Sequence, residues 1–95
     1  MVKAFIKRKV PRDKAREMIP LFRKMRAMAM EQPGYISGET LKNYNDPEEY
    51  MVISAWQSAE DWQSWLESKE RQEIQGQIDE LLGSKTEYSL YAPGV

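Results

Sequence analysis

The chain has 95 residues, the size of one domain, with 14 basic and 15 acidic side chains and a net charge of −1. This balance argues against a nucleic-acid surface, which normally carries an excess of basic residues. The chain contains no cysteine and no histidine, which excludes disulfides, thiolate and imidazole metal ligands, a histidine on haem iron and a Ser-His-Asp triad.

Nothing in the sequence indicates a membrane span or a secretory leader. No apolar run approaches the ~20 residues that a membrane-spanning helix needs. The segment from Met1 to Lys9 threads basic residues through apolar ones and lacks the basic start and apolar block of a signal peptide. We therefore expect one cytoplasmic domain over residues 1–95, with no membrane or nucleic-acid partner.

The first predicted element is a strand from Val2 to Val10. Apolar residues occupy positions 2, 4, 6 and 10, whereas lysines occupy positions 3, 7 and 9, as in a strand that buries one face. Phe5 interrupts the polar side, so the second face is partly covered too. Pro11 ends the strand, because proline lacks the N–H that a sheet ladder needs.

A long helix is predicted next, from Arg12 to Gln32. Pro20 lies inside it and should kink it, because proline removes one backbone hydrogen bond. Its apolar residues recur at helical spacing in one wide stripe: Ala15, Met18, Ile19, Phe22, Met25, Met28 and Ala29. We expect its methionines, Met30 included, to line a soft, adaptable core.

A hairpin of two strands follows the helix. Its first strand, Tyr35 to Tyr44, contains Gly38 as a bulge or a point of close approach. Asn45-Asp46-Pro47 has the composition of a turn. Tyr50 to Trp56 is a β-branched and aromatic run that returns antiparallel.

Two helical segments and a last strand complete the chain. Ser58 suits the N-cap of the first segment, and Asp61 supports it three residues later. Ser68 is placed to cap the second, which Gly83 ends in the left-handed conformation. Thr86 to Tyr91 is the last predicted strand.

The predicted order is β-α-β-β-α-β, an α+β, ferredoxin-like split βαβ unit with a four-stranded antiparallel sheet and helices on one face. The other face of the sheet has no predicted cover, yet Met51, Ile53 and Ala55 share that parity on the return strand. An exposed apolar face usually marks an interface. We therefore expect a homodimer in which two sheets pack face to face.

The three tryptophans gather where the return strand gives way to the next helix. Trp62 and Trp65 lie three positions apart on one helical face, and both core packing and contact with a ligand are open for them. Trp56 ends the strand and is expected in the core or at the dimer interface. We expect any binding site to lie near this cluster.

Two stretches resemble the antibiotic biosynthesis monooxygenase family: Gln32 to Leu41, and Val52 to Leu66 with its Asp61-Trp62-x-x-Trp65-Leu66 ending. Lys85-Thr86-Glu87-Tyr88 is similar too. The resemblance covers nearly the whole chain and implies a dimeric α+β barrel, in which two sheets meet back to back. It also implies an apolar pocket between sheet and helices in each subunit.

Family members of known activity are of two kinds. Some oxidise polycyclic phenols, anthrones or hydroquinones with O₂ and no cofactor, and others open the haem ring by means of an asparagine, a tryptophan and a histidine. These three positions correspond here to Lys7, Trp65 and about Gln75. Because two of the three are lost and no histidine exists elsewhere, the sequence disfavours haem degradation and predicts no cofactor and no metal.

The cofactor-free reaction needs a flat apolar substrate to be held, one proton to be removed and water to be excluded. Trp65, with Trp62 and Tyr35 as helpers, is expected to stack on the substrate. Substrate contacts are also expected from Phe22 and Met25.

A polar group must stabilise the negative charge that develops on the substrate. Lys7 or Arg71 is expected to do so, although Lys7 also fits a solvated surface charge. Gln75 is a further expected substrate contact. The proton acceptor stays open among a carboxylate, a tyrosinate, a lysine of lowered pKa and water.

The leading hypothesis is a homodimeric monooxygenase that oxidises a phenol or quinol with O₂. The alternative is a non-catalytic dimeric domain that binds a small molecule or serves as a stress-associated scaffold. The alternative explains the missing proton acceptor without a further assumption.

Overall fold

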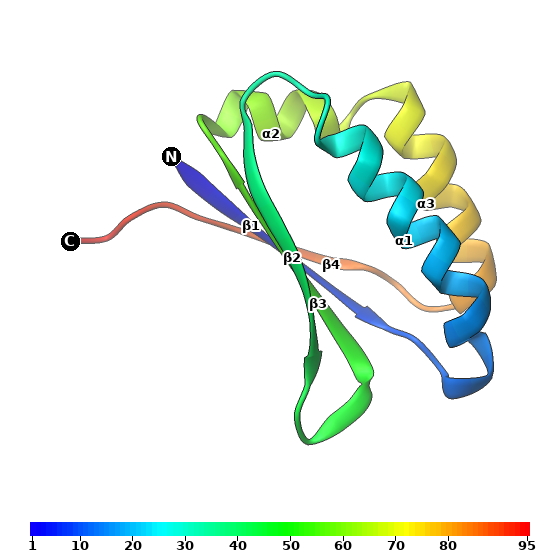
Figure 1. Ribbon diagram of the computed structural model, residues 1–95. Helices are drawn as coiled ribbons and strands as arrows, with labels where there is room; N and C mark the ends of the chain where they lie inside the picture. Colours follow the sequence, from blue (N-terminus) through cyan, green and yellow to red (C-terminus); the bar gives the residue numbers. More distant parts are fainter.

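The computed structural model describes the whole chain, Met1–Val95, as one sheet with its helices gathered on one face (Figure 1). The elements follow in the order β1 (Val2–Lys9), the 3-10 turn η1 (Arg12–Lys14), α1 (Ala15–Ala29), β2 (Tyr35–Asn43), β3 (Asp46–Trp56), α2 (Ala59–Leu66), α3 (Lys69–Leu82) and β4 (Glu87–Tyr91). The predicted α+β, ferredoxin-like order is confirmed, and no helix is long and apolar enough to cross a bilayer.

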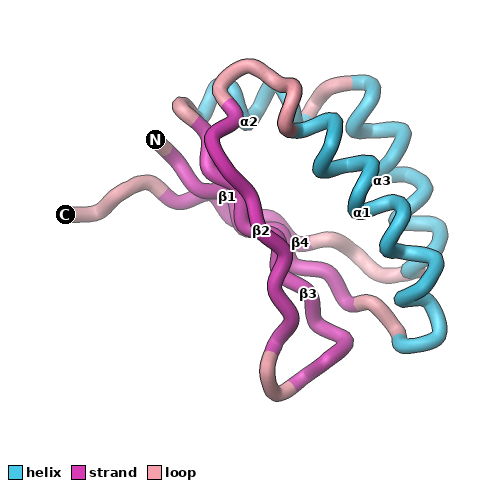
Figure 2. Tube along the Cα trace, viewed as in Figure 1, coloured by secondary structure: helices cyan, strands magenta, loops and turns pink.

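The sheet has the strand order β2-β3-β1-β4, and every neighbouring pair is antiparallel (Figure 2). Alternate residues of β1 therefore point to opposite faces. Ala4, Ile6 and Arg8 are buried beneath the helices, whereas Lys3 and Lys7 point to the other side. We call these the helix face and the outer face of the sheet.

The predicted helix caps are confirmed. Ser58 Oγ accepts from the Asp61 N–H at 3.1 Å, and Ser68 Oγ accepts from the Arg71 N–H at 3.3 Å. Gly83 has φ +64° at the end of α3, a conformation that only glycine adopts without strain. The two serines therefore fix where α2 and α3 begin, and so which of their residues face the sheet.

The turn of the hairpin lies earlier than predicted. Tyr44-Asn45 forms the tight turn, and Asp46 and Pro47 already belong to β3. Asp46 Oδ1 accepts from the Glu48 N–H at 3.1 Å, a local side-chain bond that aspartate also makes in turns. The sequence pattern therefore identified a real irregularity but displaced the turn itself by one residue.

Gly38 is a point of close approach, as predicted, but it is not the bulge. The register slips at Ile36, between the pairs Tyr35–Trp56 and Ser37–Ala55. A Cβ at Gly38 would lie 2.6 Å from the Tyr35 hydroxyl oxygen, so a larger residue there would displace the Tyr35 ring.

The predicted apolar stripe of α1 is correct at its centre and wrong at Ile19, and the predicted core position of Met30 is wrong too. Met18 and Met25 are buried, but Ile19 is 44% and Met30 is 60% exposed. Ile19 is one position, or about 100°, around the helix from Met18 and so lies at the edge of the stripe. Met30 follows the last residue of α1 and is not part of the core.

Candidate functional site

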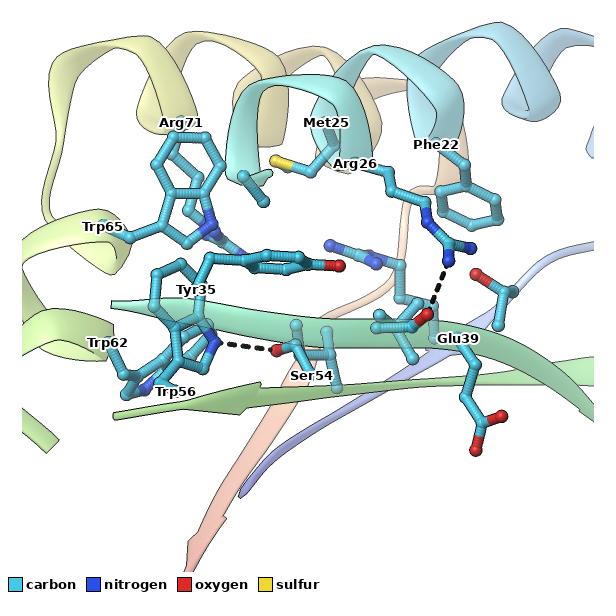
Figure 3. A pocket seen from close by; sticks show the side chains of 16 residues that line it. Phe22, Met25, Arg26, Tyr35, Glu39, Ser54, Trp56, Trp62, Trp65 and Arg71 are labelled. Carbon is cyan, nitrogen blue, oxygen red and sulfur yellow. Dashed lines mark hydrogen bonds between the residues drawn. The ribbon is translucent and has the colours of Figure 1, made fainter. Parts of the chain in front are cut away.

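A cavity lies between the helix face of the sheet and the three helices, with lining residues from β1, β2, β3, α1, α2 and α3 (Figure 3). Its free space, the mouth included, is about 530 Å³, and nine of its 16 lining residues are hydrophobic. Such a lining suits an apolar molecule better than a strongly hydrated one. Its aromatic walls are Phe22, Tyr35, Trp56, Trp62 and Trp65.

Trp56 anchors one wall of the cavity. Its side chain is fully buried, and its indole Nε1 donates to Ser54 Oγ at 3.0 Å. The Tyr35 ring meets Trp56 edge-on at 5.4 Å, and Trp62 packs on it at 5.9 Å between ring centroids. Because other aromatic rings of the protein already pack against Trp56, its main role is to stabilise the wall of the cavity.

Trp65 differs from the other two tryptophans. It is buried and lines the cavity, but it pairs with no other aromatic ring of the protein. An indole without a protein partner is the one best placed to stack on a ligand. Figure 3 shows the Tyr35 ring below Trp65, with its hydroxyl directed toward the middle of the cavity.

Two arginines complete the lining, Arg8 on β1 and Arg71 on α3. They are only 3% and 2% exposed, and neither forms an ion pair. Arg8 Nη2 donates to Gln75 Oε1 at 2.9 Å, but Arg8 Nε, Arg71 Nε and Arg71 Nη2 have no hydrogen-bond partner. The cavity therefore holds buried cationic donors that the protein itself does not satisfy.

Aromatic rings partly compensate these charges. The Arg8 guanidinium lies 5.4 Å from the Phe22 ring centroid, and Arg71 lies 5.2 Å from Tyr88 and 5.8 Å from Trp62. The negative faces of such rings attract cations. Stacking of this kind does not supply the hydrogen-bond acceptors that the free N–H groups need.

The pKa of Arg8 shows how incomplete the compensation is. Burial and then the positive charge of Arg71 lower this pKa to about 10, against smaller opposing effects of Tyr88 and Asp79. Arg8 still carries its proton at neutral pH. The only carboxylate residue of the lining, Glu39, points away from the other labelled side chains (Figure 3).

Gln75 stands behind Arg8 and does not line the cavity. Its amide nitrogen donates to Asp79 Oδ1 at 2.8 Å and to Thr86 Oγ1 at 3.0 Å, so its oxygen is turned toward Arg8. Gln75 was predicted as a substrate contact. The structure gives it instead the geometry of a positioning residue for Arg8.

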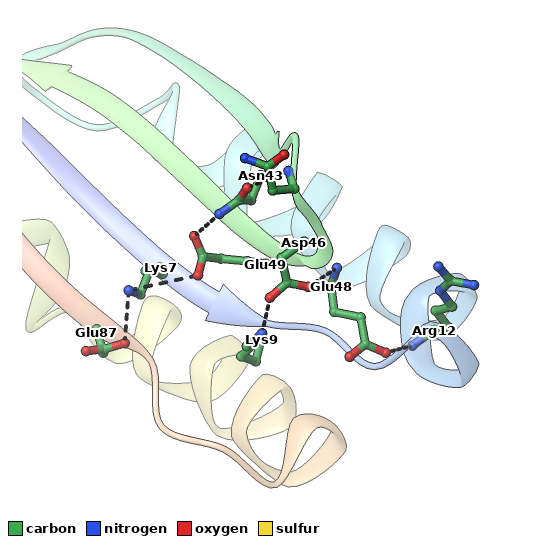
Figure 4. A network of polar contacts seen from close by, with 9 residues as sticks. Lys7, Lys9, Arg12, Asn43, Asp46, Glu48, Glu49 and Glu87 are labelled. Atoms are coloured by element: carbon green, nitrogen blue, oxygen red, sulfur yellow. Dashed lines mark hydrogen bonds and ion pairs between the residues drawn. The ribbon is translucent and has the colours of Figure 1, made fainter.

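Most of the predicted site residues lie together. The following six line the same cavity: Trp65, Arg71, Trp62, Tyr35, Phe22 and Met25. Lys7 does not, because residue 7 of β1 has the outward parity. It lies between Glu49 at 4.0 Å and Glu87 at 3.8 Å on the outer face (Figure 4), so the expectation that Lys7 stabilises substrate charge is wrong for this cavity.

Arg8 is the site residue that the sequence reasoning missed. The signal was present: position 8 shares its parity with Ala4, Ile6 and Val10, all buried on the helix face. A charged residue in the register of an apolar strand face is uncommon, because buried charge is unfavourable without a partner. Such a position therefore marks a site more strongly than the surface lysines around it do.

Arg26 closes part of the cavity mouth. It is exposed on α1, and its guanidinium donates to the carbonyl oxygen of Gly38 on β2. Figure 3 shows this side chain reaching from the helix to the sheet.

No group of three or more acidic side chains that would hold a metal ion is present.

Comparison with known proteins agrees with this arrangement. The sequence model described as antibiotic biosynthesis monooxygenase matches residues 1–77. The chain belongs to this family. The match includes all six lining residues that the sequence predicted, and it gives the chain a monooxygenase-like domain. A search of curated protein sequences found no match.

Solved structures show the same fold at low sequence identity. A conserved protein from Methanosarcina mazei Go1 has a TM-score of 0.90 at 19% identity, over 98% of this chain and 92% of that one. SnoaB, a cofactor-independent oxygenase from Streptomyces nogalater, has a TM-score of 0.84 at 20% identity, over 97% and 91%. The Rv0793 protein from Mycobacterium tuberculosis has a TM-score of 0.83 at 20% identity, over 100% and 97%.

Proposed function

We propose that this protein is a cofactor-independent monooxygenase that oxidises a phenol or quinol-type aromatic molecule with O₂. The observation that carries the proposal is that the unpaired indole of Trp65 and the buried guanidinium of Arg71 line one largely apolar cavity. A flat ring stacked on Trp65 would have its oxygen within reach of a cationic donor. The name of SnoaB as a cofactor-independent oxygenase supports this class of reaction.

The reaction is balanced without a further reductant. The phenol loses its O–H proton, and the phenolate transfers one electron to O₂ to give a phenoxyl radical and superoxide. These combine through a new C–O bond at a ring carbon, and protonation gives a hydroperoxide. Loss of the C–H proton then breaks the O–O bond, so that one oxygen atom stays as the quinone carbonyl and the other leaves as water.

The first step is the one that the protein accelerates. Positive charge beside a phenol favours its ionised form and lowers its pKa, and Arg71 supplies such charge in a site that excludes most water. No lysine lines the cavity, and Glu39 points away from it. Of the acceptors that the sequence left open, we propose water.

We further propose that two copies pair through the outer face, in a protein that works in the cytoplasm. Leu41, Ile53 and Tyr91 lie on this face in register with β1, and Leu41 and Tyr91 are 45% and 60% exposed. The flanking Lys7 and Glu49 carry opposite charges, which suits a surface that meets itself about a two-fold axis. A second copy would cover this apolar strip, as the dimeric α+β barrel implied by the family requires.

The alternative function is non-catalytic binding of a small molecule. It is favoured by one observation, that no carboxylate or lysine of the cavity is placed to accept a proton. The two functions differ in whether oxygen is consumed, since both use the same cavity.

Oxygen uptake with a panel of anthrones and hydroquinones separates them. Wild type should consume O₂ with at least one member, and Trp65→Ala should reduce the rate at least about tenfold, because the stacking wall is removed. Tyr44→Ala is the matched control, since Tyr44 is fully exposed in the hairpin turn. Equal rates for wild type and Trp65→Ala, or no uptake in either, would contradict the proposed reaction.

A further inference from the structure

We infer that Arg8 and Arg71 form a binding site for a carboxylate, so that the cavity takes a flat aromatic acid in preference to a neutral aromatic molecule. The inference rests on the proposed function only in placing the substrate in this cavity. It adds the class of substrate, which the aromatic walls alone do not decide.

The two guanidinium groups lack a counter-charge. Both side chains are more than nine-tenths buried, and the charge of each acts on the other. The carboxylate whose charge raises the pKa of Arg8, that of Asp79, accepts from Gln75 and forms no ion pair with either arginine. Two buried like charges without an anion are unfavourable, so an anionic ligand gains attraction from both.

The free donors have the geometry of a carboxylate site. Nε and Nη2 of a guanidinium lie side by side on one edge of its plane, and these are the two atoms that lack partners in Arg71. Two parallel N–H groups on one edge match the two oxygens of a carboxylate. Arg8, whose Nε is a third donor without a partner, lines the same cavity.

A carboxylate fits this site better than a phenol does. A carboxylic acid is fully ionised at neutral pH, whereas a phenol with a pKa near 10 arrives uncharged and leaves both cations unpaired. A phosphate supplies charge but is tetrahedral and strongly hydrated, whereas the aromatic residues of the lining favour an acid that is carried on an apolar ring. The site therefore points to a carboxylate carried by the ring system that Trp65 stacks on.

Binding of 2-naphthoate and of its neutral isostere 2-naphthamide tests the inference directly. Wild type should bind naphthoate at least about tenfold more tightly in calorimetry, as expected for charge-assisted hydrogen bonds. Arg71→Met should bring the two affinities within about twofold, chiefly through weaker binding of naphthoate. Arg23→Met, an arginine exposed on α1, is the matched control and should keep the full preference.

Equal affinities in wild type, or a full preference retained in Arg71→Met, would overturn the carboxylate site. Because the Arg71 side chain makes no hydrogen bond within the protein, its loss should not prevent folding. If Arg71→Met nevertheless fails to fold, Arg8→Met decides by the same comparison. In a further measurement, inorganic phosphate and benzoate compete separately with naphthoate at the same ionic strength. Competition by phosphate as strong as that by benzoate would contradict a carboxylate-specific site.

The outcome is separable from that of the proposed reaction, because binding is measured without turnover. Oxidation of neutral anthrones without any preference for naphthoate would leave the monooxygenase and remove the acid site. A clear preference for naphthoate, with no oxygen uptake on hydroxylated naphthoates or on neutral anthrones, would leave the acid site and remove the reaction.

Discussion

Positive side chains have acidic partners on the outer face of the sheet and none on the helix face. On the outer face, Lys7 lies between Glu49 and Glu87 and Lys9 pairs with Asp46 (Figure 4), although these lysines are partly exposed and water would solvate them anyway. On the helix face, Arg8 and its neighbour from α3 are buried and have no acidic partner.

Stability alone would favour the reverse arrangement, because a partner matters most where water is excluded. Exposed ion pairs contribute little, whereas uncompensated buried charges are a liability for the ligand-free protein. The helix face of this sheet is therefore organised for something other than the stability of the empty fold, and the outer face is not. Four substitutions test that difference.

The largest effect is expected on the helix face, from Trp56→Ala. Trp56 is fully buried and packs against Tyr35 and Trp62, so truncation should lower the free energy of unfolding by about 3–5 kcal/mol. Urea denaturation measures this. The exposed Tyr44→Ala should change it by less than about 0.5 kcal/mol, and a similarly small loss at Trp56 would mean that this wall is not the braced structure described.

The second effect concerns association through the outer face. Ile53→Glu places a charge at the centre of β3 on that face, where it would be buried in the proposed homodimer, and should convert the dimer to a folded monomer. Sedimentation velocity should show about half the mass, with an unchanged circular dichroism spectrum. Gln77→Glu on the exposed side of α3 adds the same charge and should stay dimeric. A monomeric wild type would refute the pairing outright.

The third effect is a pH dependence on the helix face. Above pH of about 10 the folded protein releases the Arg8 proton, while the unfolded chain, in which the Arg8 pKa is higher, keeps it, so the free energy of unfolding increases with rising pH. Arg8→Met lacks this gain. The unfolding free energy of wild type minus that of Arg8→Met should therefore increase from pH 8 to pH 10.5, by an amount on the order of 1 kcal/mol or less within this window. Parallel pH curves in urea denaturation would show that Arg8 is not destabilised by its surroundings.

The smallest effect is expected from the exposed ion pair of Lys9 and Asp46. Its hydrogen bond raises the pKa of Lys9 and lowers that of Asp46. The pair therefore stabilises most between the two pKa values, and its contribution fades as pH falls through the Asp46 pKa or rises through that of Lys9. Lys9→Met should change the melting temperature least of the four substitutions. In 1 M salt its difference from wild type should vanish, because salt screens exposed pairs.

The order of elements and their caps followed from the sequence because these signals are local. Ser58, Ser68 and Gly83 each act on backbone groups within a few positions, and the period of apolar residues separates strand from helix. Tertiary features were harder. Lys7 was assigned to the site by analogy of position, although its own alternation with Ile6 indicates the opposite face.

Arg8 was not predicted as a site residue because a strand is recognised by its apolar residues. A single charged residue on the buried face does not change that pattern. Gln75 lies beside the cavity-lining Arg8, but its role depends on Asp79, one turn along α3, and on Thr86, the residue before β4. Contacts of that kind between separate elements leave no periodic trace in the sequence. The surroundings of the two arginines therefore could not be predicted from the sequence and became evident only in the structure.

The N-cap of α3 has a consequence beyond helix stability. Ser68 accepts from the backbone of Arg71, which makes Arg71 the third residue of the helix, at the end where the helix dipole is positive. A cation there is disfavoured, yet for an incoming acid the oriented peptide units add to the pull of the guanidinium. Each residue advances about 100° around a helix, so a start displaced by one position would present a different side chain to the cavity. By fixing where α3 begins, the Ser68 hydroxyl therefore determines that a ligand in the cavity meets the positive charge of Arg71.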